Sequence, residues 1–176
     1  LGRRLEAGPL LPAEVVDLLT QAALGLDATH ERGIVHRDLK PDNLFVTRRP
    51  DGTPLLKILD FGIAKMVARS AAKSTRAIGT PLYMSPEQVT SASKTLDGRT
   101  DVYSLCATLY EMLTLKAPYA SHEIARLVDE IRNEEPLLPS KISSACTKDV
   151  DAVVAHAMAK DPRDRYRTMA EFALDL

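Results

Sequence analysis

The segment from Asp101 to Leu115 constrains the fold of this chain more than any other. Val102, Leu105 and Leu109, with Met112 and Leu113 after them, give it the character of a strongly apolar helix. Such a helix is stable only when other elements cover it, because exposed apolar surface is unfavourable in water. We therefore expect a buried helix here, with other parts of the chain packed against it.

Most of the remaining chain is also patterned for helices. Apolar residues from Val15 to Leu26 recur at helical spacing within residues 12–30, which begin with Pro12 and are followed by the stop signal Gly33. Ser121 is a plausible N-cap, and residues 168–171 fit a capping box. The other expected helices are 1–7, 85–90, 121–133, 147–160 and a last one from 168.

One short region favours β-structure. Residues 44–46 and 56–59 are apolar and are separated by the turn signal Pro50-Asp51-Gly52. Residues 61–84 show little regular pattern, and loops of that length are usually functional or disordered. The expected fold class is therefore mainly α with a small β-hairpin region.

Composition excludes several functions. The 176 residues suit one domain, and the net charge of −1 argues against non-specific nucleic-acid binding. No apolar run reaches the roughly 20 residues that span a bilayer, so we expect no membrane contact from this segment. The two cysteines, Cys106 and Cys146, are too few for a disulfide framework and are expected to be reduced thiols in a cytoplasmic protein.

The strongest chemical motif is the run His36-Arg37-Asp38-Leu39-Lys40-Pro41-Asp42-Asn43. Phosphoryl transfer to a hydroxyl needs a group that orients the hydroxyl and takes its proton, a cation near the phosphate, and oxygen ligands for Mg²⁺. Asp38 can accept the proton, and Lys40 can neutralise phosphate charge. Asn43 offers a carbonyl oxygen to the metal.

Two further motifs follow in order. Asp60-Phe61-Gly62 comes directly after an apolar strand and supplies a carboxylate for Mg²⁺ and a residue that permits a sharp turn. The run from Gly79 to Glu87 contains the triplet Ser85-Pro86-Glu87.

Together these motifs closely resemble the protein kinase family, whose signature is H-R-D-L-x-x-x-N, then D-F-G, then an A-P-E-like triplet. Lys40-Pro41 and Thr80 match its serine/threonine members, and S-P-E-Q is similar to bacterial kinases of the eukaryotic-like type. The resemblance implies a partial kinase domain over 1–176, with a catalytic loop at 36–43 and an activation segment at 60–87. This region would be the large, C-terminal lobe of the catalytic domain.

The resemblance also implies roles for individual residues. Asp38 and Lys40 would be catalytic; Lys40, Asn43 and Asp60 would bind ATP, with Asn43 and Asp60 on Mg²⁺. Phe45 either belongs to the strand core or forms part of the floor under the adenine. Thr80 would help to shape the acceptor site.

Other matched residues would be architectural. His36 would pack near Phe61, and Asp101 would anchor the backbone of the catalytic loop. Glu87 and Arg165 would form a bidentate pair that ties the activation segment to the lobe. Cys106 stands where the family usually has Gly, which implies a packing adjustment with no chemical consequence.

Regulation by phosphorylation is a further hypothesis. Ser74 and Thr75 lie in the irregular stretch, and Arg37 next to Asp38 could bind a phosphate there bidentately. Phosphorylation of either residue would then order the segment. They could equally be solvated loop residues.

The chain begins within a helical pattern and contains no G-x-G-x-x-G-x-V loop or V-A-I-K lysine. We therefore expect a fragment that lacks the small N-terminal lobe, which would act in cis, and we expect the isolated fragment to be inactive. The parent protein could be membrane-anchored, as many similar bacterial kinases are.

Two other functions remain open at this point. A kinase-like scaffold or pseudokinase is disfavoured because the Asp and Asn residues of the motifs are present. A small-molecule kinase of related fold would lack the Gly79–Glu87 segment, which in the resembled family docks a peptide substrate.

Overall fold

The computed structural model describes residues 1–61, 81–90 and 96–176. Its helices are α1 Gly2–Leu5, α2 Pro12–His30, α4 Pro86–Val89, α5 Gly98–Thr114, α6 Ile124–Asn133, α7 Lys148–Ala157 and α8 Met169–Asp175. Short 3-10 turns are η1 Pro41–Asn43, η3 Pro139–Lys141 and η4 Pro162–Asp164. The strands are β1 Leu44–Arg48 and β2 Pro54–Ile58. The expected fold class, mainly α with a small β-hairpin, is confirmed.

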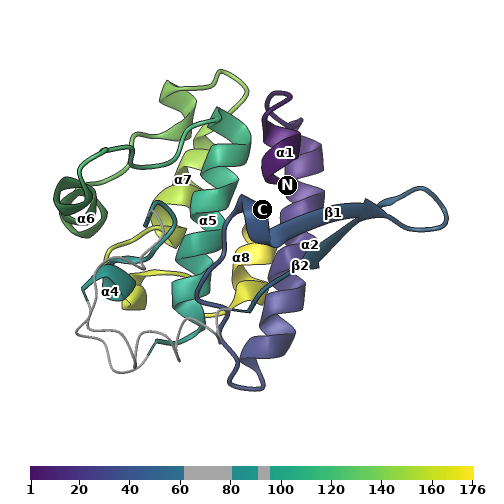
Figure 1. The fold of residues 1–176 in the computed structure, drawn as a ribbon, viewed down its shortest axis with the longest axis horizontal. Helices are drawn as coiled ribbons and strands as arrows, with labels where there is room; N and C mark the ends of the chain where they lie inside the picture. Colours follow the sequence, from purple (N-terminus) through teal and green to yellow (C-terminus); the bar gives the residue numbers. More distant parts are fainter. Residues whose placement is uncertain (62–80, 91–95) are drawn as a thin grey trace.

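Helix α5 lies in the middle of the helical body (Figure 1). Fourteen of its residues are buried, including the large side chains Tyr103 and Tyr110. Helices α2, α7 and α8 pack against it, and α2 also packs along α8. The apolar pattern of this segment therefore correctly predicted a buried helix with other elements packed around it.

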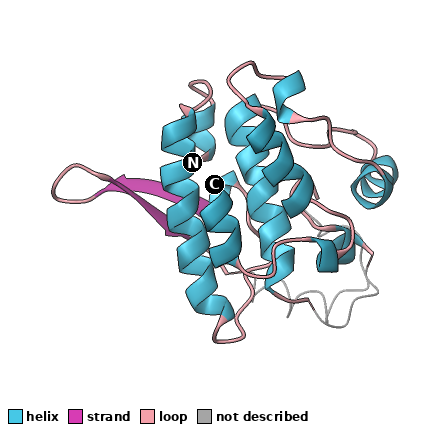
Figure 2. Cartoon of the chain, turned by 180° about the vertical axis from the view of Figure 1, so that it is seen from behind, coloured by secondary structure: helices cyan, strands magenta, loops and turns pink. Residues whose placement is uncertain are grey.

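The hairpin is antiparallel, and Phe45 pairs with Lys57 in its register. One face of the hairpin packs on the core through the buried Leu44 and Leu56, and the sheet projects away from the helices (Figures 1 and 2). Helix α2 covers the outer edge of β2, because Gln21 accepts from the N–H of Leu56 and donates to the carbonyl of Pro54.

Several expected boundaries differ from the structure. Helix α6 begins at Ile124 with Glu123 as its N-cap, so the predicted start at Ser121 was wrong. Helix α5 begins at Gly98, where the side chain of Asp97 accepts from the N–H of Arg99. At α5 the first turn is fixed by this side-chain cap, which apolar spacing does not report; α6 has no side-chain cap hydrogen bond.

The predicted end of α7 and the predicted capping box at the start of α8 also need correction. Helix α7 ends at Ala157 and not at Lys160. The carbonyls of Ala159 and Lys160 accept hydrogen bonds from the side chain of Arg165. At α8, Thr168 accepts from the N–H of Glu171 as expected, but the carboxylate of Glu171 accepts from the N–H of Arg167 in place of that of Thr168.

Candidate active site

The loop at 36–43 is anchored to α5 through Asp101. The carboxylate is fully buried and accepts from the backbone N–H groups of His36 (2.7 Å) and Arg37 (2.8 Å). A buried carboxylate is tolerated only when it has hydrogen-bond donors, and these are supplied by the loop itself. The start of α5 thus positions the two residues that precede Asp38.

Two residues of the candidate site, one in this loop and one after β2, have an unusual backbone conformation. Arg37 has a φ of 66° and Asp60 has a φ of 52°, a left-handed region that residues other than glycine rarely occupy. Residues held in sparsely populated conformations are concentrated at functional sites, where surrounding contacts stabilise them. Arg37 directly precedes the candidate base Asp38, and Asp60 is itself a predicted metal ligand.

Asp38 lies in contact with the two other motif residues of its loop. The amide Nδ2 of Asn43 donates to the main-chain oxygen of Asp38 (2.7 Å) and to its Oδ2 (3.1 Å). The ammonium of Lys40 lies 3.9 Å from the same Oδ2. The structure thus places a carboxylate, a cation and an amide within one short turn.

His36 is buried and links this loop to the end of β2. One ring nitrogen forms a hydrogen bond with the carbonyl of Leu59 (2.9 Å), and the other accepts from the N–H of Asp38 (3.2 Å). Its ring also lies against that of Phe61, with 4.7 Å between the centroids. Both ring nitrogens hold backbone groups, and this geometry suits a structural residue better than a general base.

Two oxygen-bearing side chains could hold a metal ion. Because Asn43 uses its amide nitrogen on Asp38, its Oδ1 is the end of the side chain that remains available to a cation. Asp60 has an exposed carboxylate. This donor set suits Mg²⁺, which prefers oxygen ligands and commonly takes only one or two protein carboxylates. Within residues 1–61, 81–90 and 96–176, no three His, Cys, Asp or Glu side chains form a metal-binding group.

Phe45 does not lie in the strand core, so that interpretation was wrong. The residue is 53% exposed, because it lies on the face of the hairpin opposite to the one that packs on the core through Leu44 and Leu56. Leu59, which directly follows β2, is also exposed. An exposed aromatic residue of this kind is compatible with an adenine floor.

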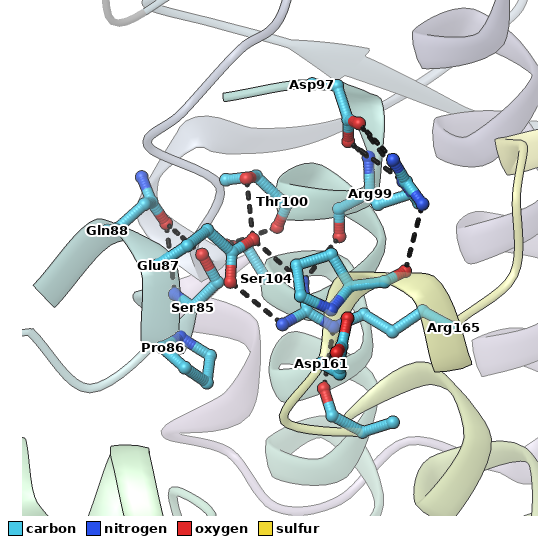
Figure 3. A network of polar contacts seen from close by, with 12 residues as sticks. Ser85, Pro86, Glu87, Gln88, Asp97, Arg99, Thr100, Ser104, Asp161 and Arg165 are labelled. Atoms are coloured by element: carbon cyan, nitrogen blue, oxygen red, sulfur yellow. Dashed lines mark hydrogen bonds and ion pairs between the residues drawn. The ribbon is translucent and has the colours of Figure 1, made fainter. Parts of the chain in front are cut away.

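Glu87 and Arg165 form a bidentate ion pair (Figure 3), with both oxygen–nitrogen distances at 2.8 Å. Thr100 donates to the same carboxylate. Arg165 also donates to the carbonyl of Arg99, so the pair connects α4, the start of α5 and the segment before α8. Burial alone would raise the pKa of Glu87, but the hydrogen bonds and charge of Arg165 outweigh burial and hold that pKa below its usual value.

The structure adds residues that the motifs did not indicate. His30, at the end of α2, forms a hydrogen bond with Oδ2 of Asp101 (2.8 Å). The side chain of Gln88 donates to the carbonyl of Arg37 (2.9 Å). A sequence signal for His30 was its position at the C-terminal end of a helix leading into the loop; Gln88 was visible only as part of S-P-E-Q.

Some predicted site residues lie outside the described part of the chain. These are Thr80 of the acceptor site and the phosphorylation candidates Ser74 and Thr75. Across the described residues, none of the helices is both long enough and apolar enough to cross a lipid bilayer.

A loop that carries Asp, Lys and Asn, fixed to a buried helix aspartate and followed by a segment held by a Glu–Arg pair, is typical of protein kinases. The family profile described as "Protein kinase domain" matches residues 2–173. The chain therefore belongs to the protein kinase domain family.

Curated relatives agree with this family. "Serine/threonine-protein kinase Pkn1" of Myxococcus xanthus is 42% identical over 167 residues, covering 93% of this chain and 24% of the relative. "Serine/threonine-protein kinase PknB" of Mycobacterium leprae is 39% identical over 171 residues, covering 96% and 26%. PknB of Mycobacterium tuberculosis is 38% identical over 172 residues, with the same coverage. The chain thus spans about a quarter of the length of these relatives.

Proposed function

We propose that the protein containing this chain transfers the γ-phosphoryl group of ATP to serine and threonine hydroxyls of other proteins. The observation that carries this proposal is the contact set of Asp38, which accepts from the amide of Asn43 and lies 3.9 Å from the ammonium of Lys40. Membership of the protein kinase family and the names of the relatives support the same reaction.

Asp38 would act on the acceptor hydroxyl. Its carboxylate accepts the hydroxyl proton and points the oxygen toward the phosphorus. The hydrogen bonds of Asn43 fix the carboxylate relative to the loop backbone, so little reorganisation is needed during the reaction. Lys40 stabilises the negative charge that the phosphate oxygens carry.

Asn43 and Asp60 would hold Mg²⁺, which supplies positive charge to the phosphate oxygens when it is bound. These two side chains suit Mg²⁺ because they offer the oxygen ligands that it prefers, an amide oxygen and a carboxylate. The exposed face of Phe45 would lie under the adenine, which has an apolar ring of matching character.

The location, the missing lobe and the regulation of the parent protein are also proposals. The parent protein would act in the cytoplasm, with a small lobe in cis that covers the ATP phosphates and with or without a membrane anchor. Thr80 would contact the acceptor site, and phosphorylated Ser74 or Thr75 would bind Arg37. Residues 1–176 alone would then have negligible activity.

The test uses the full-length protein with Mg²⁺, labelled ATP and a generic protein substrate. Asp38→Asn removes the proton acceptor while it keeps the size of the side chain, and we expect labelling to fall by about 10²- to 10⁴-fold. Asp129→Asn, an exposed substitution on α6, is the matched control and should leave labelling unchanged.

Phosphoamino-acid determination should find the label on serine or threonine. Equal labelling by the parent and by Asp38→Asn would show that Asp38 is not the base. Absence of labelling by the folded parent would support a pseudokinase or scaffold in place of an enzyme.

A further inference from the structure

Gln88 contacts the peptide group that carries Asp38. The carbonyl of Arg37 and the N–H of Asp38 belong to one planar peptide unit. Nε2 of Gln88 donates to that carbonyl (2.9 Å), and Nδ1 of His36 accepts from that N–H (3.2 Å). The peptide unit directly before the candidate base is therefore held at both of its polar ends.

This peptide unit follows a residue in a strained conformation. Arg37 has a φ of 66°, and its own N–H is held by Asp101. A backbone of this kind persists only when its surroundings determine it. Asp101 fixes the amide side of Arg37, and Gln88 fixes its carbonyl side, so the two side chains together hold the conformation that directs Asp38.

Gln88 is itself held in place. The residue is 5% exposed, and its Oε1 accepts from the N–H (3.0 Å) and the hydroxyl (3.3 Å) of Ser85. Ser85 is the N-cap of α4, and α4 is tied to the rest of the lobe through Glu87 and Arg165 (Figure 3). The amide of Gln88 thus connects this anchored helix to the backbone of the catalytic loop.

We propose that Gln88 is a positioning residue for the phosphoryl transfer: it holds the Arg37–Asp38 peptide unit so that the carboxylate of Asp38 faces the acceptor hydroxyl. The inference rests on the proposed function, because it assigns a role within that reaction. Gln88 acts through the loop backbone and does not itself touch the substrate.

Two substitutions separate the contact of Gln88 with Arg37 from its contacts with Ser85, whose N–H and hydroxyl both donate to Oε1. Gln88→Glu, studied at pH 8.5, keeps an acceptor for the N–H of Ser85 but loses the donor to Arg37. Gln88→Met fills the same space and loses the hydrogen bonds to Ser85 as well as the one to Arg37. In the full-length protein we expect both variants to lower kcat by about 10- to 100-fold, because small misplacements of a catalytic group have effects of this size. KM for ATP should change less than threefold.

Gln21→Glu is the matched control. Gln21 also bridges two backbone groups, through the N–H of Leu56 and the carbonyl of Pro54, but it lies on α2 beside the hairpin. The kcat of Gln21→Glu should equal that of the parent. If Gln88→Glu retains the parent kcat while Gln88→Met loses it, Gln88 serves only as a cap of α4 and the proposal fails.

Amide hydrogen exchange keeps this test independent of activity. The Asp38 amide should exchange faster in Gln88→Glu than in the parent or in Gln21→Glu. Unchanged exchange would overturn the positioning role even if the parent proves inactive. A parent without Asp38-dependent labelling contradicts the proposed function itself, so the two failures are distinguishable.

Discussion

Arg165 shows how much one side chain can organise. It donates five hydrogen bonds: two to Glu87 and one each to the carbonyls of Arg99, Ala159 and Lys160. A guanidinium has five N–H groups in a fixed plane, so every donor is used. The side chain is fully buried, so water cannot replace any of these hydrogen bonds, and each of them contributes to the stability of the fold.

Arg165→Lys should therefore be strongly destabilising although it keeps the charge. An ammonium has three donors and no planar fork, so buried acceptors are left unpaired. We expect the free energy of unfolding to fall by about 3 kcal/mol, measured by urea denaturation.

The control for this change is Arg163→Lys. Arg163 also pairs with a carboxylate, that of Asp161, but its side chain is 82% exposed. No measurable change in stability is expected there. Equal urea midpoints for the parent and Arg165→Lys would mean that the buried network does not contribute as described.

Helix α5 is an element whose interior tolerates little change. Cys106 lies in its middle with no exposed surface, and burial raises the pKa of its thiol, which makes it unreactive. The side chain acts as a small apolar group in the core.

Replacing this cysteine by the family's usual glycine should destabilise the protein. Cys106→Gly removes buried apolar volume and places glycine inside a helix, where it is about 1 kcal/mol less favourable than alanine. We expect a loss of about 2 kcal/mol by thermal or urea unfolding, and a smaller loss for Cys106→Ala. An unchanged stability in Cys106→Gly would indicate that the core around α5 rearranges to fill the space.

The sequence predicted elements well where burial determines them. The spacing of apolar residues predicted α2 at its observed bounds because one face of that helix is buried. The start of α6 and the end of α7 were not predictable from apolar spacing. After α7, the carbonyls of Ala159 and Lys160 accept hydrogen bonds from Arg165, a few residues further along the chain. A backbone carbonyl is present in every residue, so the sequence does not show which carbonyl a side chain will contact.

The same distinction applies to the site. Motifs placed Asp38, Asn43 and Asp101 in one region because their spacing is characteristic of the kinase family. They did not indicate Gln88, whose partner is a backbone carbonyl 51 residues earlier in the chain. Neither did they show that Phe45 is exposed, because an apolar residue in a strand has the same sequence pattern in a core and at a binding surface.

At the scale of the whole molecule, the Glu87–Arg165 pair links stability to pH. The pKa of Glu87 is lowered in the folded state, so its ionised form favours folding. This contribution is fully present above the unfolded-state pKa of about 4.3 and is lost as the pH falls through the lower folded-state value.

Comparison with Glu87→Gln isolates this effect. The difference in unfolding free energy between the parent and Glu87→Gln should be constant from pH 6 to 8 and should shrink below about pH 4. Urea denaturation at each pH measures it. A difference that stays constant down to pH 3 would show that protonation of Glu87 is not linked to unfolding.

The sequence distance within this pair has a consequence for the order of folding. Glu87 and Arg165 are 78 residues apart, and bringing them together costs more chain entropy than forming a local contact does. Local helices form before contacts of this range, so we expect the pair to be absent from the folding transition state. Interactions missing from that state slow unfolding without accelerating folding. The pair would then mainly increase kinetic stability: the folded molecule, with its site assembled, would persist longer before it unfolds.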